Sequence, residues 1–182
     1  ELREAALAFS CANGFYAIAA ARAAPQRVRR LLLCQTPGLS AMPPWTQLNV
    51  PWPVRTPLLG QALVRATRRT VARGWYGGAE PDREQRAKLR ATADHALAHG
   101  GCFCLAGVVQ GLSRARPEEL AGVKCPAQLI WGDADKSHRH TRAESLQELL
   151  PQASVEHWPE CGHFPELSQP RRYAERVLAG VC

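Results

Sequence analysis

The stretch Leu7-Ala8-Phe9-Ser10-Cys11-Ala12-Asn13-Gly14 decides how the rest of the chain is organised. It joins an apolar run, residues 5–9, which predicts a short buried strand, to an Ala-rich run, residues 15–24, which predicts a helix. A strand that passes through a tight turn into a helix can hold a Ser or Cys above a parallel sheet. The stretch therefore predicts a nucleophile at this turn, beside the free N–H groups that begin the helix.

Two neighbouring side chains are candidates for this nucleophile. Ser10 has small residues two positions away on either side, Ala8 and Ala12, which fit a tight turn well. Cys11 would lie at the helix terminus, which lowers the pKa of a thiol and can hold an oxyanion. Taken by itself, Cys11 is better explained as an inert cysteine buried after a strand, because free cysteine is among the most buried residue types.

The composition is that of a globular chain with a basic surface. The net charge is +7, and much of it comes from clustered arginines. No aromatic residues interleave with these clusters as they do in nucleic-acid-binding motifs, so we expect a solvated surface and no nucleic-acid partner. The clusters are Arg27/Arg29/Arg30, Arg65/Arg68/Arg69/Arg73 and Arg83/Arg86/Arg90.

The seven cysteines are an odd number in mostly apolar surroundings, which favours a reducing cytoplasm over a disulfide framework. Cys102-Phe103-Cys104 lacks the spacing of a zinc site, so we expect no metal and no cofactor. No run of about 18 apolar residues is present, which argues against a membrane span. The chain begins at Glu1 and its single Met is Met42, so we expect a fragment of a longer protein.

The order of predicted elements indicates a sheet interrupted by helices. A second strand, residues 28–34, forms a βαβ unit with the first. We divide the chain into core residues 1–37, a helical cap insertion at 38–117, and core residues 118–182. The insertion is predicted to hold helices at 58–72, 81–99 and 103–113, broken at Gly77-Gly78 and Gly100-Gly101. Strands at 125–132 and 153–158 and helices at 143–150 and 170–179 complete the core.

Three distant side chains form a consistent set in chain order: Cys11 (or Ser10), then Asp135, then His163. Asp135 ends the run Trp131-Gly132-Asp133-Ala134-Asp135, and His163 follows Cys161-Gly162. A carboxylate can orient a histidine, and the histidine can take a proton from the nucleophile. The set therefore points to nucleophilic attack on a carbonyl carbon.

These motifs resemble the C-terminal portion of the α/β-hydrolase superfamily. The matching segments are V-K-C-P-A-Q-L-I-W-G-D-A-D, L-L-P-Q-A-S-V and G-H-F-P-E-L-S-Q-P, within residues 123–170. In that family the last Asp of W-G-x-x-D is the acid, here Asp135, and the His of G-H-F-P is the base, here His163. The segment Pro25-Gln26-Arg27-Val28 also aligns without a gap when Cys11 takes the position of the nucleophilic Ser.

The resemblance covers residues 5–37 and 118–182 and implies a partial α/β-hydrolase fold. Such a fold has a parallel sheet of about four strands flanked by helices, with an inserted helical cap. It also implies hydrolysis of a small-molecule acyl substrate, an ester or thioester, by Cys11 (or Ser10), His163 and Asp135. The N–H of Ala12 would be one oxyanion donor, and the second would come from an N-terminal hydrolase segment that this sequence lacks.

Several assignments stay open at this stage. Asp133 is an alternative acid, and the altered turn also fits a non-catalytic ligand-binding protein of the same fold. His138 and His140 flank Arg139, and we expect them in a solvated loop rather than at a pocket mouth or in a chance metal site. Four aromatic side chains are candidates either for a substrate pocket or for packing inside the cap: Trp45, Trp52, Trp75 and Tyr76.

Overall fold

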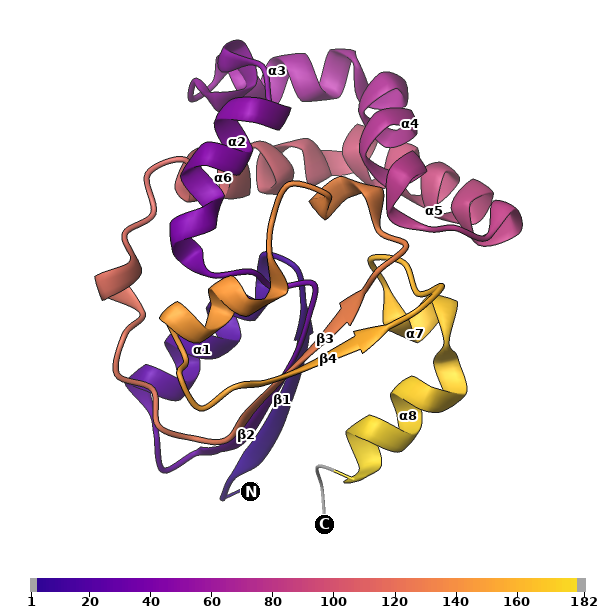
Figure 1. The fold of residues 1–182 in the computed structure, drawn as a ribbon. Coiled ribbons are helices and arrows are strands. Elements are labelled where there is room, and N and C mark those ends of the chain that lie inside the picture. The colour runs from indigo at the N-terminus through magenta and orange to yellow at the C-terminus, as the bar shows by residue number, and fades with distance from the viewer. Residues whose placement is uncertain (1–2, 180–182) are drawn as a thin grey trace.

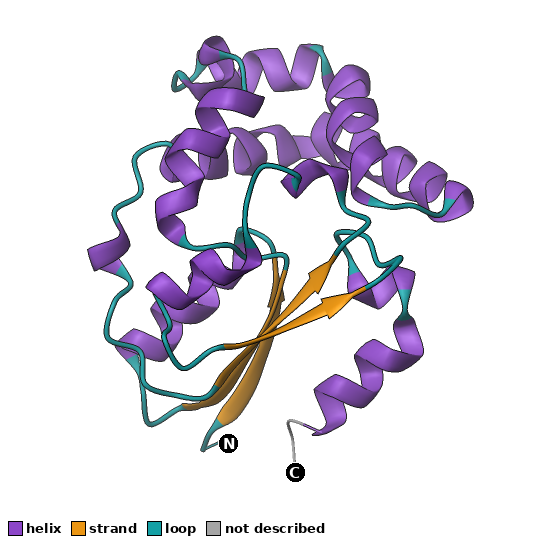
Figure 2. Cartoon of the chain, viewed as in Figure 1, coloured by secondary structure: helices purple, strands orange, loops and turns teal. Residues whose placement is uncertain are grey.

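A four-stranded parallel sheet organises the computed structural model, which describes residues 3–179 (Figures 1 and 2). The strands lie in the order β1-β2-β3-β4. Their bounds are Ala5–Ser10, Val28–Cys34, Ala127–Gly132 and Ser154–Trp158. The predicted parallel sheet of about four strands is confirmed. The predicted outer limits at residues 1 and 182, and Cys182, lie outside the described residues.

Both faces of the sheet are covered by helices, because successive side chains of the central strands point to opposite faces and are apolar on both. Leu31 and Leu33 of β2 belong to a core with Ile18 of α1 (Asn13–Ala23). Leu32 faces the other way, into a smaller core against which Tyr173 of α8 packs. Helix α8 spans Pro170–Ala179 and follows the short α7, Pro165–Ser168. This period of two is what a strand buried on both faces requires.

Between β2 and β3 the chain forms a helical layer, residues 39–112, above the carboxyl ends of the strands (Figure 1). The layer has an apolar cluster of its own, which includes Val64, Leu97 and Ala106. The division into core and cap domains stays a prediction. The helices of the layer are α2 Met42–Asn49, α3 Leu59–Ala66, α4 Arg68–Ala79, α5 Arg83–Ala96 and α6 Cys102–Leu112.

Three helix predictions were wrong in detail. The single helix expected at 58–72 is two helices, α3 and α4, separated at Thr67, and α4 runs through Gly77 and Gly78. The guanidinium of Arg90 in α5 lies against Gly77, and this packing of α5 on α4 outweighs the weak helix propensity of the two glycines. The helix expected at 81–99 ends at Ala96 in a π-type turn, Leu97–Gly101. The helix expected at 143–150 is a 3₁₀ turn, Ala143–Glu148, shortly before Pro151.

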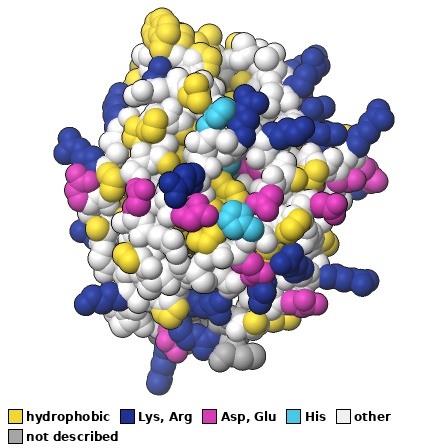
Figure 3. Space-filling view, viewed as in Figure 1, with side chains coloured by type: hydrophobic (Ala, Val, Ile, Leu, Met, Phe, Trp, Pro, Cys, Tyr) yellow, Lys and Arg dark blue, Asp and Glu magenta, His cyan; other side chains and the backbone are white. Residues whose placement is uncertain are grey.

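The charged side chains are distributed over the surface seen in Figure 3, and the cysteines form no disulfides in the described part of the chain. On the face seen in Figure 3, Lys and Arg side chains are spread around the molecule with Asp and Glu among them. The described cysteines are all free thiols. Within residues 3–179, no helix combines the length and the apolar character needed to cross a bilayer.

Candidate active site

Cys11 occupies the sharp turn between β1 and α1 in a strained backbone conformation. Its φ is +54°, in the left-handed region that residues other than glycine rarely adopt. The turn is held from three sides: the Cys11 N–H donates to the carbonyl of Cys34 at 2.7 Å, and the Cys11 carbonyl accepts from Gly14 N–H and Thr36 Oγ1. A side chain at Gly14 would collide with Thr36, which explains the glycine that follows the turn.

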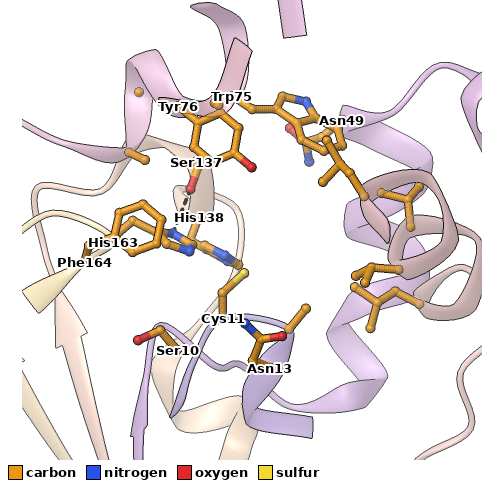
Figure 4. A pocket seen from close by; sticks show the side chains of 18 of the residues that line it. Ser10, Cys11, Asn13, Asn49, Trp75, Tyr76, Ser137, His138, His163 and Phe164 are labelled. Atoms are coloured by element: carbon orange, nitrogen blue, oxygen red, sulfur yellow. Dashed lines mark hydrogen bonds between the residues drawn. The ribbon is translucent and has the colours of Figure 1, made fainter. Parts of the chain in front are cut away.

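Ser10, the other candidate nucleophile, is the last residue of β1. Its side chain points away from His163 in the close-up view, whereas the Cys11 sulfur points toward the histidines (Figure 4). The Ser10 hydroxyl interacts instead with the thiol of Cys34. The turn therefore brings Cys11, and not Ser10, to the histidine.

Asp135 and His163 form a buried pair at the carboxyl end of the sheet. His163 Nδ1 lies 2.7 Å from Asp135 Oδ2, and both side chains are nearly inaccessible. Asp135 also accepts hydrogen bonds from Gln35 Nε2 on Oδ2 and from the Ser137 N–H and Oγ on Oδ1. Burial opposes ionisation of Asp135, but these donors and the charge of His163 prevail and lower its pKa to about 2.

Gln35 is a site residue that the sequence analysis missed. It follows β2 directly, is fully buried and has a φ of +46°. Besides donating to Asp135, its Oε1 accepts from the N–H of Gly132 at 2.9 Å, so it ties the end of β2 to the acid loop. A glutamine directly after an apolar strand, where the carboxyl ends of parallel strands meet, was the signal that could have revealed it.

Asp133, the alternative acid, lies elsewhere. Its carboxylate is exposed and bonds His157 Nδ1 at 2.7 Å, on strand β4. The geometry therefore pairs His163 with Asp135.

The thiol of Cys11 differs in acidity from the buried thiols of Cys34 and Cys161. Burial disfavours its thiolate, but the charge and the hydrogen bond of His163, together with the contact of His138, lower the pKa of Cys11 to about 5. Conversely, burial opposes a charge on His163, yet the Cys11 thiolate and Asp135 raise the pKa of that imidazole to about 10. At Cys34 and Cys161, burial raises the thiol pKa to about 12 and about 11. Cys11 and His163 thus favour a thiolate–imidazolium ion pair.

His138 is not in a solvated loop, contrary to the expectation. It is only 5% exposed and lies between two rings, stacked 5.7 Å from Trp45 and 5.2 Å from His163 between centroids. Trp45 belongs to α2, and its Nε1 donates to the carbonyl of Ser137, so the helical layer closes over this loop. His140, in contrast, is exposed and accepts a hydrogen bond from Arg139.

The helical layer also holds the loop that carries His163. The His163 N–H donates to the carbonyl of Ala79 at the end of α4, at 2.6 Å. The next residue, Glu80, is 1% exposed, and its Oε2 accepts from Ser168 Oγ, which in turn accepts from the Gly162 N–H. The position of the histidine therefore depends on a segment far away in the sequence.

A cavity of about 870 Å³ opens above Cys11 and His163. Of the four predicted aromatic residues, Trp45, Trp75 and Tyr76 line it, as does Ala12. Trp52 does not: it lies outside the cavity and is 67% exposed, in a short 3₁₀ turn. Further apolar side chains line the space where an acyl group could lie: Met42, Leu97, Leu105, Val108, Val109 and Leu112.

Comparisons with known proteins agree with this architecture. The curated protein LipZ of Mycobacterium tuberculosis, a hydrolase by name, is 35% identical over 54 residues, which are 30% of this chain and 19% of LipZ. The structure of Est816, described as an N-acyl homoserine lactone degrading enzyme, superposes with a TM-score of 0.74 and 16% identity. The superposition covers 98% of this chain and 68% of the Est816 chain.

The enol-lactonase of Burkholderia xenovorans LB400 superposes with a TM-score of 0.66 and 17% identity, over 99% of this chain and 66% of its own length. The chain thus spans about two thirds of these structures and matches less than a fifth of LipZ. The model of the alpha/beta hydrolase family matches residues 5–176, nearly the whole chain. This match, together with the parallel sheet and the similar folds, places the chain in the alpha/beta hydrolase family.

Proposed function

We propose that this protein hydrolyses ester or thioester bonds of a small acyl substrate through Cys11, His163 and Asp135. The observation that carries the proposal is the arrangement around His163. One ring nitrogen bonds the buried carboxylate of Asp135, and the other side of the ring faces the Cys11 thiol. A nucleophile, a base and an orienting acid in contact are the elements of acyl-transfer catalysis.

The chemistry follows from this order of contacts. The Cys11 thiolate attacks the substrate carbonyl carbon, and the imidazolium of His163 gives its Nε2 proton to the leaving alcohol or thiol. Water then attacks the carbonyl carbon of the Cys11 thioester while His163 Nε2 takes a proton from the water. The C–S bond breaks, which releases the acid and restores the Cys11 thiolate beside the imidazolium. Asp135 keeps Nδ1 protonated and stabilises the imidazolium in both steps. The Ala12 N–H, at the start of α1, is the proposed donor to the oxyanion.

Two features support an ester-like rather than a strongly charged substrate. The cavity is lined mainly by apolar side chains, and aromatic rings stand at its wall. Among the structural relatives, Est816 and the enol-lactonase are named for lactones, which are cyclic esters. We therefore propose an apolar acyl or lactone group as the part bound beneath the helical layer.

The test is turnover of a panel of p-nitrophenyl esters and acyl thioesters by wild-type protein and three variants. We expect Cys11→Ala to reduce kcat/KM by about 10³-fold or more and Ser10→Ala to stay within about tenfold of wild type. Cys125→Ser is the control thiol, because Cys125 is partly exposed and lies outside the cavity. Mass spectrometry of the quenched reaction should show the acyl group on the Cys11 peptide.

Two results would contradict the proposal. Activity that survives Cys11→Ala but is lost in Ser10→Ala would move the nucleophile to Ser10. No turnover across the panel, together with ligand binding that is unchanged in His163→Ala, would favour a non-catalytic binding protein.

A further inference from the structure

Three side chains that can ligate a metal converge at the floor of the cavity. The sulfur of Cys11 and one ring nitrogen each of His138 and His163 all lie within 4.8 Å of one another. They come from three separate loops, after β1, β3 and β4, and meet in the close-up view (Figure 4). From the sequence we expect no metal at Cys102-Phe103-Cys104 and a solvated loop rather than a chance metal site at His138 and His140, and these expectations do not consider Cys11, His138 and His163 together.

Hydrogen bonds orient both imidazoles so that Nε2 is the available ligand atom. Nδ1 of His163 is engaged by Asp135. Nδ1 of His138 lies 2.9 Å from Thr141 Oγ1, and that hydroxyl donates its own proton to the carbonyl of His138. With its hydroxyl proton directed at this carbonyl, Thr141 Oγ1 accepts from Nδ1 of His138, an arrangement that assigns the lone pair to Nε2. Such outer contacts fix the histidine ligands of zinc sites in the same way.

We propose that Cys11, His138 and His163 bind one Zn²⁺ ion, with the fourth coordination position open to the cavity. A thiolate with two imidazoles suits zinc or cobalt, whereas magnesium and calcium prefer oxygen ligands. In a tetrahedral zinc site, ligand atoms are about 3.4–3.6 Å apart, so the three groups, whose ligand atoms lie within 4.8 Å of one another, would draw closer and reorient around the ion. Binding releases one proton, the one that Cys11 and His163 share.

The ion would suppress the proposed hydrolysis, because it occupies the sulfur and the Nε2 lone pair of His163. Only this consequence rests on the proposed function; the binding itself does not. A second histidine pair on the surface, His95 and His99, serves as the internal comparison. Their rings are 4.2 Å apart between centroids, but both side chains are exposed and no third ligand joins them in the described part of the chain.

The experiment titrates metal-free protein with Zn²⁺ by calorimetry and with Co²⁺ by absorption spectroscopy. We expect one ion per chain, with the intense visible bands of tetrahedral Co²⁺ and a near-ultraviolet thiolate-to-metal band. Cys11→Ala should remove the thiolate band, and His138→Ala should weaken binding by at least tenfold. The exposed neighbour His140 and the surface pair give the controls: His140→Ala and His95→Ala should bind as wild type.

Thr141→Val is a second test of the zinc site, because His138→Ala also removes the ring that stacks on Trp45. It leaves the imidazole in place but removes its Nδ1 partner, and we expect about 10–100-fold weaker binding with an unchanged circular dichroism spectrum. Zn²⁺ affinity that is unchanged in His138→Ala, or lost in His95→Ala, would overturn the site. Ester turnover is measured in a separate assay, with and without Zn²⁺. A protein that binds Zn²⁺ but hydrolyses no ester would therefore contradict only the proposed hydrolase function and not the zinc site.

Discussion

The carboxylate of Glu80 accepts a hydrogen bond from the hydroxyl of Ser168 at 2.6 Å and so joins the helical layer to the loop that carries His163. Glu80 is almost completely buried, and its second oxygen accepts from the N–H of Asp82. Because an acceptor removed from a buried network leaves its donors without partners, this contact makes the histidine's position sensitive to a residue that is not part of the proposed triad.

Glu80→Ala is therefore expected to lower both stability and turnover. Loss of a buried acceptor for two donors should reduce the free energy of unfolding by about 2–3 kcal/mol, measured by urea denaturation. A fall in kcat at unchanged KM would show that His163 has moved. Glu80→Gln keeps one acceptor oxygen and should recover part of both losses. Wild-type kcat in Glu80→Ala would show that the loop holds its position without this bond.

The pKa of Cys11 predicts selective alkylation at acidic pH. Its thiolate forms as pH rises through about 5, while the thiols of Cys34 and Cys161 stay protonated up to about pH 11. Iodoacetamide at pH 6 should therefore label Cys11 first, as read by peptide mass spectrometry. In His163→Ala the largest influence that lowers the Cys11 pKa is absent and only the contact of His138 opposes burial, so the Cys11 pKa should rise and labelling at pH 6 should slow strongly. Uniform labelling of all thiols would contradict the ion pair.

The pH profile of kcat/KM should be bell-shaped. The acidic limb reports the lowered pKa of Cys11, about 5, because attack needs the thiolate. The alkaline limb reports the raised pKa of His163, about 10, because the leaving group needs the imidazolium proton. Asp135→Asn removes a charge that helps to hold this proton. We therefore expect the alkaline limb to shift to lower pH and kcat to fall by about 10³–10⁴-fold. An alkaline limb that does not move would assign it to another group.

Gly14 is expected to tolerate no side chain. A Cβ there would lie 2.3 Å from Thr36 Oγ1, a hydroxyl that supports the Cys11 carbonyl, so Gly14→Ala should cost about 1–3 kcal/mol and reduce turnover. Gly107 in α6 is the matched control, because nothing lies within 4 Å of a Cβ built there. Gly107→Ala should instead stabilise the helix by about 0.5–1 kcal/mol. Thermal unfolding of the two variants should therefore shift in opposite directions.

Local patterns predicted much of the fold and singled out Cys11, Asp135 and His163, whose catalytic roles stay a proposal. Short stretches rich in apolar residues marked the strands, and each proposed site residue lies at or shortly after the end of one: Cys11 directly after β1, Asp135 in the loop after β3 and His163 in the loop after β4. What the sequence did not reveal are contacts between distant segments. Gln35 reaches Asp135 across 100 positions and Glu80 reaches Ser168 across 88, and neither has a local motif.

The errors have the same origin. His138 looked solvated because it lies among polar residues, but Trp45 from the helical layer covers it. Trp52 looked like a pocket residue because of its aromatic character, but its turn faces solvent. Which side of a loop becomes buried is decided by the element packed over it, and that element is not in the local sequence.

The imidazole of His138 touches two indoles, since Trp45 stacks on one of its faces and Trp131 meets it edge-on at 5.6 Å between centroids. Both indoles thus stand within a few ångströms of the proposed reaction centre. The protein consequently carries its own optical reporter: events at that centre should alter ultraviolet emission without any attached dye, and turnover could be followed in real time by stopped-flow fluorescence.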